Sequence, residues 1–282
     1  MTKTVALITG ANKGIGFETA RQLAALDMTV LVGARDESRG RQAEEDLRAE
    51  GADARFVHLD VTDPTSVAAA AAWIDEEYGH LDILINNAGT ATISRQRALA
   101  SETSLEDMRA VYDINVFGVV SVTNAMLPLL RRAEAARIVN VSSEVGSIGS
   151  QSDPASPLFG MPASAQYPSS KSAVNMLTAM YARELKDTPI KVNAANPGFT
   201  DTDFNDHRGS APRQRVRSRA CTWRRFLRTG RRASCGDICG WPRATAATAS
   251  CPGNPASADD TKFRGTTMIG TAHLERKHAC PR

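Results

Sequence analysis

The sequence predicts a single doubly wound α/β domain, with a parallel sheet and helices on both faces, over residues 1–207. Three observations lead to this fold class. Short β-branched runs alternate with longer amphipathic segments, as in consecutive βαβ units. Several of the strand-like runs are continuously apolar, which suits a sheet covered on both faces. The alternation ends near residue 207, and we expect an irregular tail at 208–282.

The first half of the domain shows the alternation most clearly. The predicted strands are 4–9, 29–34 and 54–61. The predicted helices are 17–27, 40–50 and 66–79. A helix-length connection between strand-like runs is what a parallel pair requires, so these segments predict βαβ units.

The second half continues the pattern with longer helices. The predicted strands are 81–89, 136–143 and 190–198, and the predicted helices are 104–135 and 167–186. Between Ser147 and Gln166 the chain is rich in Ser and Gly and carries Pro154, Pro157 and Pro162, which indicates an irregular insertion. Six strands in total fit one doubly wound domain.

Charge and cysteine content divide the chain at the same place. Residues 1–207 carry 18 Lys and Arg against 27 Asp and Glu, whereas 208–282 carry 16 against 4. All five cysteines also follow residue 207. We expect a cytoplasmic protein that does not enter membranes, because residues 1–7 lead directly into a strand and no long uninterrupted apolar run appears.

A glycine-rich turn follows the first strand and opens the first helix. In such a place glycines let the backbone approach a pyrophosphate, and the free N–H groups of the helix start favour its negative charge. Alone, a glycine triplet is weak support for nucleotide binding. The candidate residues of this turn are Gly10, Asn12, Lys13, Gly14, Ile15 and Gly16.

Tyr167 and Lys171 lie four residues apart in a predicted helix, so their side chains share one face. A tyrosine is a poor acid–base catalyst near neutrality, but a neighbouring ammonium favours its phenolate and brings its pKa closer to the working pH. Such a pair is common on solvated helices. We therefore weigh it together with Ser143 at the end of a strand and Asn115 in the preceding helix.

The order of these motifs resembles the short-chain dehydrogenase/reductase family, and NADPH-dependent carbonyl reductases most of all. The pattern Thr-Gly-x-x-x-Gly-Ile-Gly is followed in family order by further motifs. They are Asp60-Val61, Asn86-Asn87-Ala88-Gly89, Asn115, Ser143, Tyr167 with Lys171, and Pro197-Gly198.

The resemblance implies a role for each matching residue. Asp60 and Val61 would meet the adenine, Asn87 would lie beside the adenine-side ribose, and Lys171 would also bind the nicotinamide ribose. The segment near the nicotinamide carboxamide would comprise Pro197, Gly198, Thr200 and Thr202.

In the implied catalytic tetrad, Tyr167 protonates the carbonyl oxygen, Ser143 hydrogen-bonds it, Lys171 lowers the pKa of Tyr167 and Asn115 holds a relay water. A buried asparagine bonded to backbone is the alternative for Asn115. Ser142 competes with Ser143, and the family pattern favours Ser143, since alternation lets only one of them face the cofactor.

Arginines at the end of the second strand decide our choice of cofactor. A 2′-phosphate needs cations, whereas a bare ribose hydroxyl is usually held by a carboxylate at this place. Arg35 and Arg39, with Lys13 in the glycine turn, predict NADP(H), although Asp36 argues against it. The insertion before Tyr167 favours a monomer by resemblance to monomeric carbonyl reductases, with a disordered loop as the alternative.

The tail at 208–282 departs from the family pattern. A shifted reading frame in a GC-rich gene would produce its Arg, Pro and Cys content and destroy its periodicity, and this is our leading hypothesis. An arginine-rich arm with Trp223 and Phe226 that binds nucleic acid is a weaker alternative. We expect no metal site, because Cys235 and Cys239 lack the spacing of paired zinc ligands.

The function predicted from these residues is hydride transfer between NADP(H) and a small-molecule aldehyde or ketone. The alternative is a weak or inactive nucleotide-binding protein, because the substrate-covering segments and the last strand are unrecognisable.

Overall fold

A computed structural model describes residues 3–91, 99–198 and 200 of the chain, and the account that follows concerns these residues. They contain a six-stranded parallel sheet in the order β3-β2-β1-β4-β5-β6. The strands are β1 (Val5–Thr9), β2 (Thr29–Ala34), β3 (Ala54–His58), β4 (Ile83–Asn86), β5 (Arg137–Val141) and β6 (Lys191–Ala195). The predicted fold class and the six predicted strands are confirmed.

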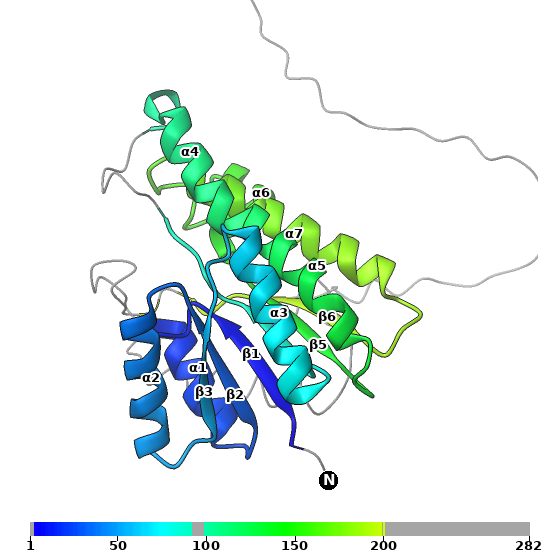
Figure 1. The fold of residues 1–282 in the computed structure, drawn as a ribbon. Helices are drawn as coiled ribbons and strands as arrows, with labels where there is room; N and C mark the ends of the chain where they lie inside the picture. Colours follow the sequence, from blue (N-terminus) through cyan, green and yellow to red (C-terminus); the bar gives the residue numbers. More distant parts are fainter. Residues whose placement is uncertain (1–2, 92–98, 199, 201–282) are drawn as a thin grey trace, which may run out of the picture. The chain divides into compact units, whose positions relative to one another are not determined.

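Helices connect the strands as the alternation predicts (Figure 1). The longer ones are α1 (Gly14–Ala24), α2 (Glu37–Ala49), α3 (Pro64–Tyr78), α4 (Leu105–Tyr112), α5 (Gly118–Leu130) and α7 (Gln166–Glu184). Three short elements are η1 (Ala100–Glu102), η3 (Glu144–Gly146) and α6 (Ile148–Ser152). The predicted insertion before Tyr167 therefore consists of turns and one short helix.

Local capping explains where several helices begin. The Asp36 carboxylate accepts the N–H of Arg39 at 2.9 Å at the start of α2, and the Asp63 carboxylate does the same for Thr65 at the start of α3. Pro64 follows that cap at a position where a helix needs no N–H. Helix α3 ends at Tyr78 and is followed by Gly79, whose φ of +72° favours glycine.

The core divides into two clusters, one on each face of the sheet, because alternate strand residues point to opposite sides. Leu7 and Leu31 belong to the cluster that includes residues of α3, α5 and α7. Ala6 and Val30 belong to the cluster that includes residues of α1 and α2. Figure 1 shows α3, α5 and α7 grouped together and α1 and α2 grouped apart from them.

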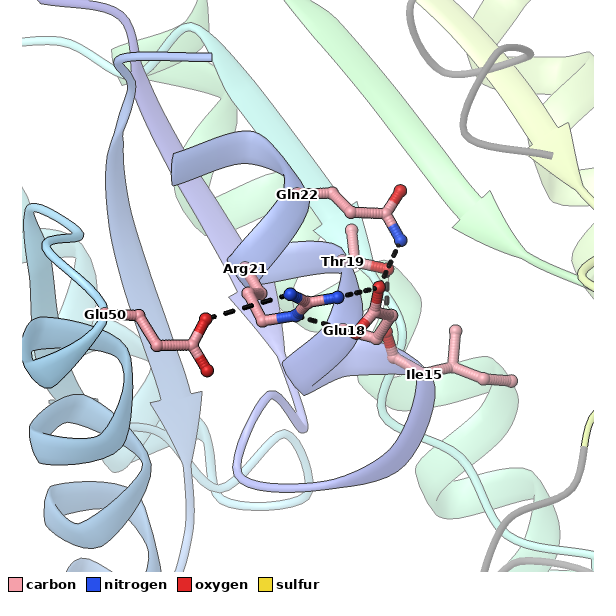
Figure 2. Close-up of polar contacts among 6 residues, drawn as sticks. All are labelled: Ile15, Glu18, Thr19, Arg21, Gln22 and Glu50. Atoms are coloured by element: carbon pink, nitrogen blue, oxygen red, sulfur yellow. Dashed lines mark hydrogen bonds and ion pairs between the residues drawn. The ribbon is translucent and has the colours of Figure 1, made fainter. Parts of the chain in front are cut away.

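Helix α1 is further secured by polar contacts among partly buried side chains along one side (Figure 2). Glu18 accepts hydrogen bonds from Arg21 at 2.7 and 2.9 Å and from Gln22 at 2.7 Å. Arg21 also lies 3.8 Å from the carboxylate of Glu50, the residue that caps the end of α2. These contacts join the first two helices, and so hold the helix that follows the glycine turn.

The predicted helix at 104–135 differs from expectation in its middle. A π-helical segment, η2 (Asp113–Phe117), separates α4 from α5, and the Gly118 N–H donates to the Asp113 carbonyl. The run Leu105–Leu130 is long and apolar enough to cross a membrane by length and composition, although polar residues interrupt it. Its Val122 and Met126 are buried in the core beside the sheet, as in the central helix of a globular domain.

Candidate active site

The glycine turn lies between β1 and α1. Gly10 and Gly14 have φ values of +64° and +59°, a region that strongly favours glycine. A Cβ atom on Gly16 would lie 2.5 Å from both the Asn87 amide nitrogen and the Gly10 carbonyl oxygen. The first residue before α1, Lys13, makes no side-chain cap, so the helix start can offer its N–H groups to an anion. This cradle fits a dinucleotide pyrophosphate.

The turn is attached to the neighbouring strand β4 by two side chains. The Asn87 amide nitrogen donates to the carbonyls of Thr9 at 2.9 Å and Gly10 at 3.2 Å. In return, the Thr9 hydroxyl accepts the N–H groups of Asn87 and Ala88, both at 2.9 Å. The Asn87 side chain thus fixes the shape of the turn, and its contact with a ribose stays a prediction.

Three cations lie in the region predicted to select the cofactor. Arg35 directly follows β2, Arg39 lies in the first turn of α2, and both are exposed, as is Lys13. Asp36 is engaged locally, since its carboxylate caps α2 and lies 3.5 Å from the Arg39 guanidinium. The carboxylate that argued against NADP(H) therefore has a structural role at the helix start. Convergence of the three cations on a phosphate stays a prediction.

Asp60 and Val61 follow β3. The Asp60 carboxylate accepts the N–H of Thr62 at 2.9 Å and its hydroxyl at 2.7 Å. Partial burial opposes ionisation, but these two bonds and the charge of Arg35 hold the pKa of Asp60 below its usual range. Val61 is buried beside Gly118, where an added Cβ would lie 2.8 Å from the Val61 side chain. Their contact with adenine stays a prediction.

The segment after β6 turns sharply. Gly198 has a φ of +74°, and its N–H donates to the Asn196 side chain at 2.9 Å. The hydroxyl of buried Thr200 donates to the Pro197 carbonyl at 3.2 Å. Thr202, the remaining residue predicted for this segment, lies outside the described residues, as do all five cysteines and the tail at 208–282. Within the described ranges there is no group of three metal-ligating side chains.

Ser143 lies where β5 ends and η3 begins, and its hydroxyl hydrogen-bonds Tyr167. Ser142 is buried and turns elsewhere, donating to the Asn175 side chain at 2.7 Å. The structure therefore brings Ser143, and not Ser142, to the tyrosine.

Lys171 follows Tyr167 by one turn of α7 and is almost fully buried. Its ammonium nitrogen donates to the Val141 carbonyl at 2.8 Å and lies 5.6 Å from the centre of the Tyr167 ring. A Cβ atom on Gly89 would lie 3.8 Å from that nitrogen and 3.3 Å from the Asn115 side-chain oxygen. The loop after β4, the π-helical segment at Asn115 and the face of α7 that carries Lys171 thus meet at one place.

Burial governs the pKa values of the pair. It raises the pKa of Tyr167 to about 12, and the hydrogen bond with Ser143 acts in the opposite direction. Burial also lowers the pKa of Lys171 to about 8. That the Lys171 ammonium brings the Tyr167 pKa closer to the working pH stays a prediction, because the raised pKa reflects burial of the phenol. The low-dielectric surroundings disfavour the charged form of both groups.

Asn115 lies in the π-helical segment and is buried. Its amide nitrogen donates to the Thr90 carbonyl at 2.8 Å and the Ser170 hydroxyl at 3.0 Å, and its oxygen accepts the Thr90 N–H at 2.8 Å. Both amide hydrogens are therefore used within the protein, which is the alternative that sequence reasoning left open. A relay water held by this residue stays a prediction.

These features lie at the carboxyl ends of β1, β4 and β5. From β1 the chain adds strands first on one side and then, from β4, on the other, so the site lies where the strand order reverses. Sequence reasoning missed Thr9 and Ser170 as site residues. Thr9 was visible as the hydroxyl before the glycine turn, whereas the contact of Ser170 with Asn115 joins residues 55 positions apart and leaves no local signal. The arrangement can hold a phosphate-bearing cofactor and present a protonated phenol beside a hydroxyl.

Comparison with known proteins agrees with this geometry. Residues 4–213 match the family model described as short chain dehydrogenase. A short-chain dehydrogenase, anuI, of Penicillium roqueforti is 41% identical over 217 residues, which cover 74% of this chain and 83% of that protein. NADPH-bound carbonyl reductase from chicken fatty liver superposes with a TM-score of 0.68 at 30% identity, covering 78% of this chain and 90% of the other. A gluconate 5-dehydrogenase from Burkholderia cenocepacia, in complex with NADP and tartrate, superposes with a TM-score of 0.64 at 28% sequence identity. The match covers 73% of this chain and 75% of the other.

Proposed function

Because this chain belongs to the short-chain dehydrogenase/reductase family, we propose that it transfers a hydride between NADP(H) and the carbonyl group of a small molecule. The reaction would reduce an aldehyde or ketone to an alcohol, or oxidise the alcohol in reverse. The observation that carries the proposal is the hydrogen-bonded pair of Ser143 and Tyr167, with Lys171 one helical turn away.

A bound nicotinamide cofactor would supply the hydride. Tyr167 supplies the proton to the carbonyl oxygen, and its raised pKa keeps the phenol protonated at neutral pH. Ser143 holds the same oxygen by a hydrogen bond as negative charge develops there. Although burial lowers the pKa of Lys171 to about 8, its ammonium is mostly charged below that pH. This charge stabilises the phenolate that is left on Tyr167 after the proton has been transferred.

The preference for NADP(H) rests on the exposed cations Arg35, Arg39 and Lys13 near the glycine turn. The Asp36 carboxylate caps α2 and pairs with Arg39, so its charge acts mainly against that cation and the proposal rests most on Arg35. Two similar solved structures contain NADP or NADPH, which supports the same choice for this chain. Residues of the glycine turn would hold the pyrophosphate through backbone N–H groups.

Turnover by the full-length chain tests the proposal. Purified protein is mixed with NADPH or NADH and a panel of aldehydes and ketones, and loss of the reduced nicotinamide absorbance is followed. We expect turnover with NADPH, and we expect Tyr167→Phe to abolish it while cofactor binding, measured by fluorescence, stays nearly intact. Binding without turnover across the panel would instead indicate a nucleotide-binding protein that lacks catalysis.

A further inference from the structure

The two adjacent serines at the end of β5 have different surroundings. Ser143 meets Tyr167, whereas Ser142 is only 5% exposed and donates to the Asn175 side-chain oxygen at 2.7 Å. Asn175 lies one helical turn after Lys171 on α7. A buried hydroxyl bond therefore links the residue before Ser143 to the helix that carries both Tyr167 and Lys171.

The link continues into the turn that follows Ser143. The Asn175 amide nitrogen donates to the Gly146 carbonyl at 3.3 Å, and the Ser172 hydroxyl donates to the same oxygen at 2.9 Å. The Gly146 N–H in turn donates to the Ser143 carbonyl at 3.1 Å. The backbone on both sides of Ser143 is thus held by side chains of α7.

Gly146 makes this contact unusually close. A Cβ atom there would lie 2.6 Å from the Lys171 carbonyl carbon and 2.9 Å from its oxygen. These are backbone atoms of a buried residue in the middle of a helix, so they cannot move aside cheaply. Element η3 therefore lies directly against the backbone of Lys171, at a distance that only glycine allows.

From these contacts we propose that Ser142 and Asn175 are positioning residues, which fix the Ser143 turn against α7 and so keep the Ser143 hydroxyl in register with Tyr167. Neither residue touches the reacting atoms. Ser143 follows the strand β5 and Tyr167 lies on the helix α7, so their hydrogen bond depends on how these two elements pack against each other. The expected effect of Ser142 and Asn175 on turnover rests on the proposed function, but their expected effect on the placement of Ser143 against Tyr167 does not.

The test compares Ser142→Ala and Asn175→Ala with the full-length wild-type chain. A displaced catalytic group costs rate, so we expect kcat to fall about tenfold in each variant while KM for NADPH changes by less than about twofold. The double variant should lose little more than Asn175→Ala alone, because the two changes share the 2.7 Å bond and the other contact of the Ser142 hydroxyl, with the Lys171 carbonyl, is long at 3.5 Å. Ser142→Thr keeps the hydroxyl and should recover most of the lost kcat.

Thr29→Val is the matched control. Thr29 is also 5% exposed and donates to the Asp53 carboxylate at 2.8 Å, but it lies at the opposite end of β2 from the site. It should lower Tm as Ser142→Ala does and leave kcat unchanged. An unchanged kcat in Ser142→Ala, or an equal loss of kcat in Thr29→Val, would overturn the proposal.

A second measurement separates this proposal from the proposed function. In protein labelled on the tyrosine ring, the Tyr167 signal is assigned with Tyr167→Phe, and its chemical shift reports the hydrogen bond with Ser143. We expect Ser142→Ala to move this signal in the direction that Ser143→Ala does, and Thr29→Val to leave it in place. A signal that stays unmoved in Ser142→Ala would contradict the positioning role even in a chain without turnover. Absence of turnover in the wild type would instead count against the proposed function alone.

Discussion

The buried ammonium of Lys171 donates a hydrogen bond to the carbonyl of Val141 at 2.8 Å, and this bond joins α7 to the end of β5 just before Ser143. One bond compensates only part of the lost hydration of an ammonium, which has three N–H groups to satisfy. Hence burial lowers the pKa of Lys171 to about 8.

The first prediction concerns the pH dependence of stability. Between pH 8 and the ordinary lysine value of 10.5, the unfolded chain binds more protons at Lys171 than the folded chain, so unfolding free energy should rise with pH. The full rise is at most about 3 kcal/mol. In urea unfolding at several pH values, Lys171→Met should flatten this rise. An equal slope in both proteins would refute the assignment.

Above pH 10 the sign reverses for Tyr167. Its folded pKa of about 12 lies above the ordinary value of 10, so the folded state holds its proton longer. The stability that this group contributes is present below pH 10 and is lost as pH rises through 12. The same urea series on Tyr167→Phe should show a smaller loss of stability over this interval than the wild type does.

The second prediction concerns the choice of cofactor. Arg35→Ala should raise KM for NADPH about tenfold or more and leave KM for NADH within about twofold, because only NADPH carries the additional phosphate. Arg41→Ala is the control, since Arg41 is also exposed but lies in α2, where it pairs with Glu37 at 2.8 Å. Equal changes in KM for NADPH and NADH in Arg35→Ala would mean that the Arg35 guanidinium does not bind the additional phosphate.

The third prediction concerns the glycine turn. Gly16→Ala would place a carbon atom 2.5 Å from the Asn87 amide nitrogen and the Gly10 carbonyl, so the turn has to open. We expect NADPH binding to weaken by at least about tenfold and unfolding free energy to fall by about 1–3 kcal/mol. Gly160→Ala, where no atom lies within 4 Å of the added carbon, should leave both quantities unchanged. Normal NADPH affinity in Gly16→Ala would contradict the proposed cradle.

Periodicity was sufficient to predict the sheet, because strands buried on both faces and amphipathic helices each leave a regular pattern. It did not reveal the π-helical segment at Asp113–Phe117, since neither proline nor glycine interrupts the apolar repeat there. The glycine turn and the Tyr167–Lys171 pair were recognisable because one local spacing defines each of them.

Features that depend on tertiary packing were not accessible from the residue pattern alone. Strand alternation implied that only one of Ser142 and Ser143 faces the site, and the choice of Ser143 came from the resemblance to the family, because the docking of α7 decides it. Burial, which raises the pKa of Tyr167, was not foreseen for a similar reason. Helical spacing indicates that Lys171 lies near Tyr167, but it does not indicate that both side chains are buried.

The last prediction concerns a buried polar network beneath the site. Asn86 on β4 donates to the side chains of Thr123 at 3.0 Å and Asn140 at 2.8 Å, and Asn140 on β5 donates to Thr178 on α7 at 2.8 Å. All four side chains are buried. The network therefore connects two neighbouring strands with the helices that pack on them.

Asn140→Ala would remove both of its bonds, leaving an amide hydrogen of Asn86 without its partner and opening a cavity between β5 and α7. We expect unfolding free energy to fall by about 2–4 kcal/mol, measured by urea unfolding. Asn124→Ala removes the acceptor of the Tyr181 hydroxyl bond at 2.8 Å from an exposed position, and it should cost less than about 1 kcal/mol, because water can replace the lost partner. A similar small cost for both variants would mean that water enters and satisfies the network after Asn140 is removed.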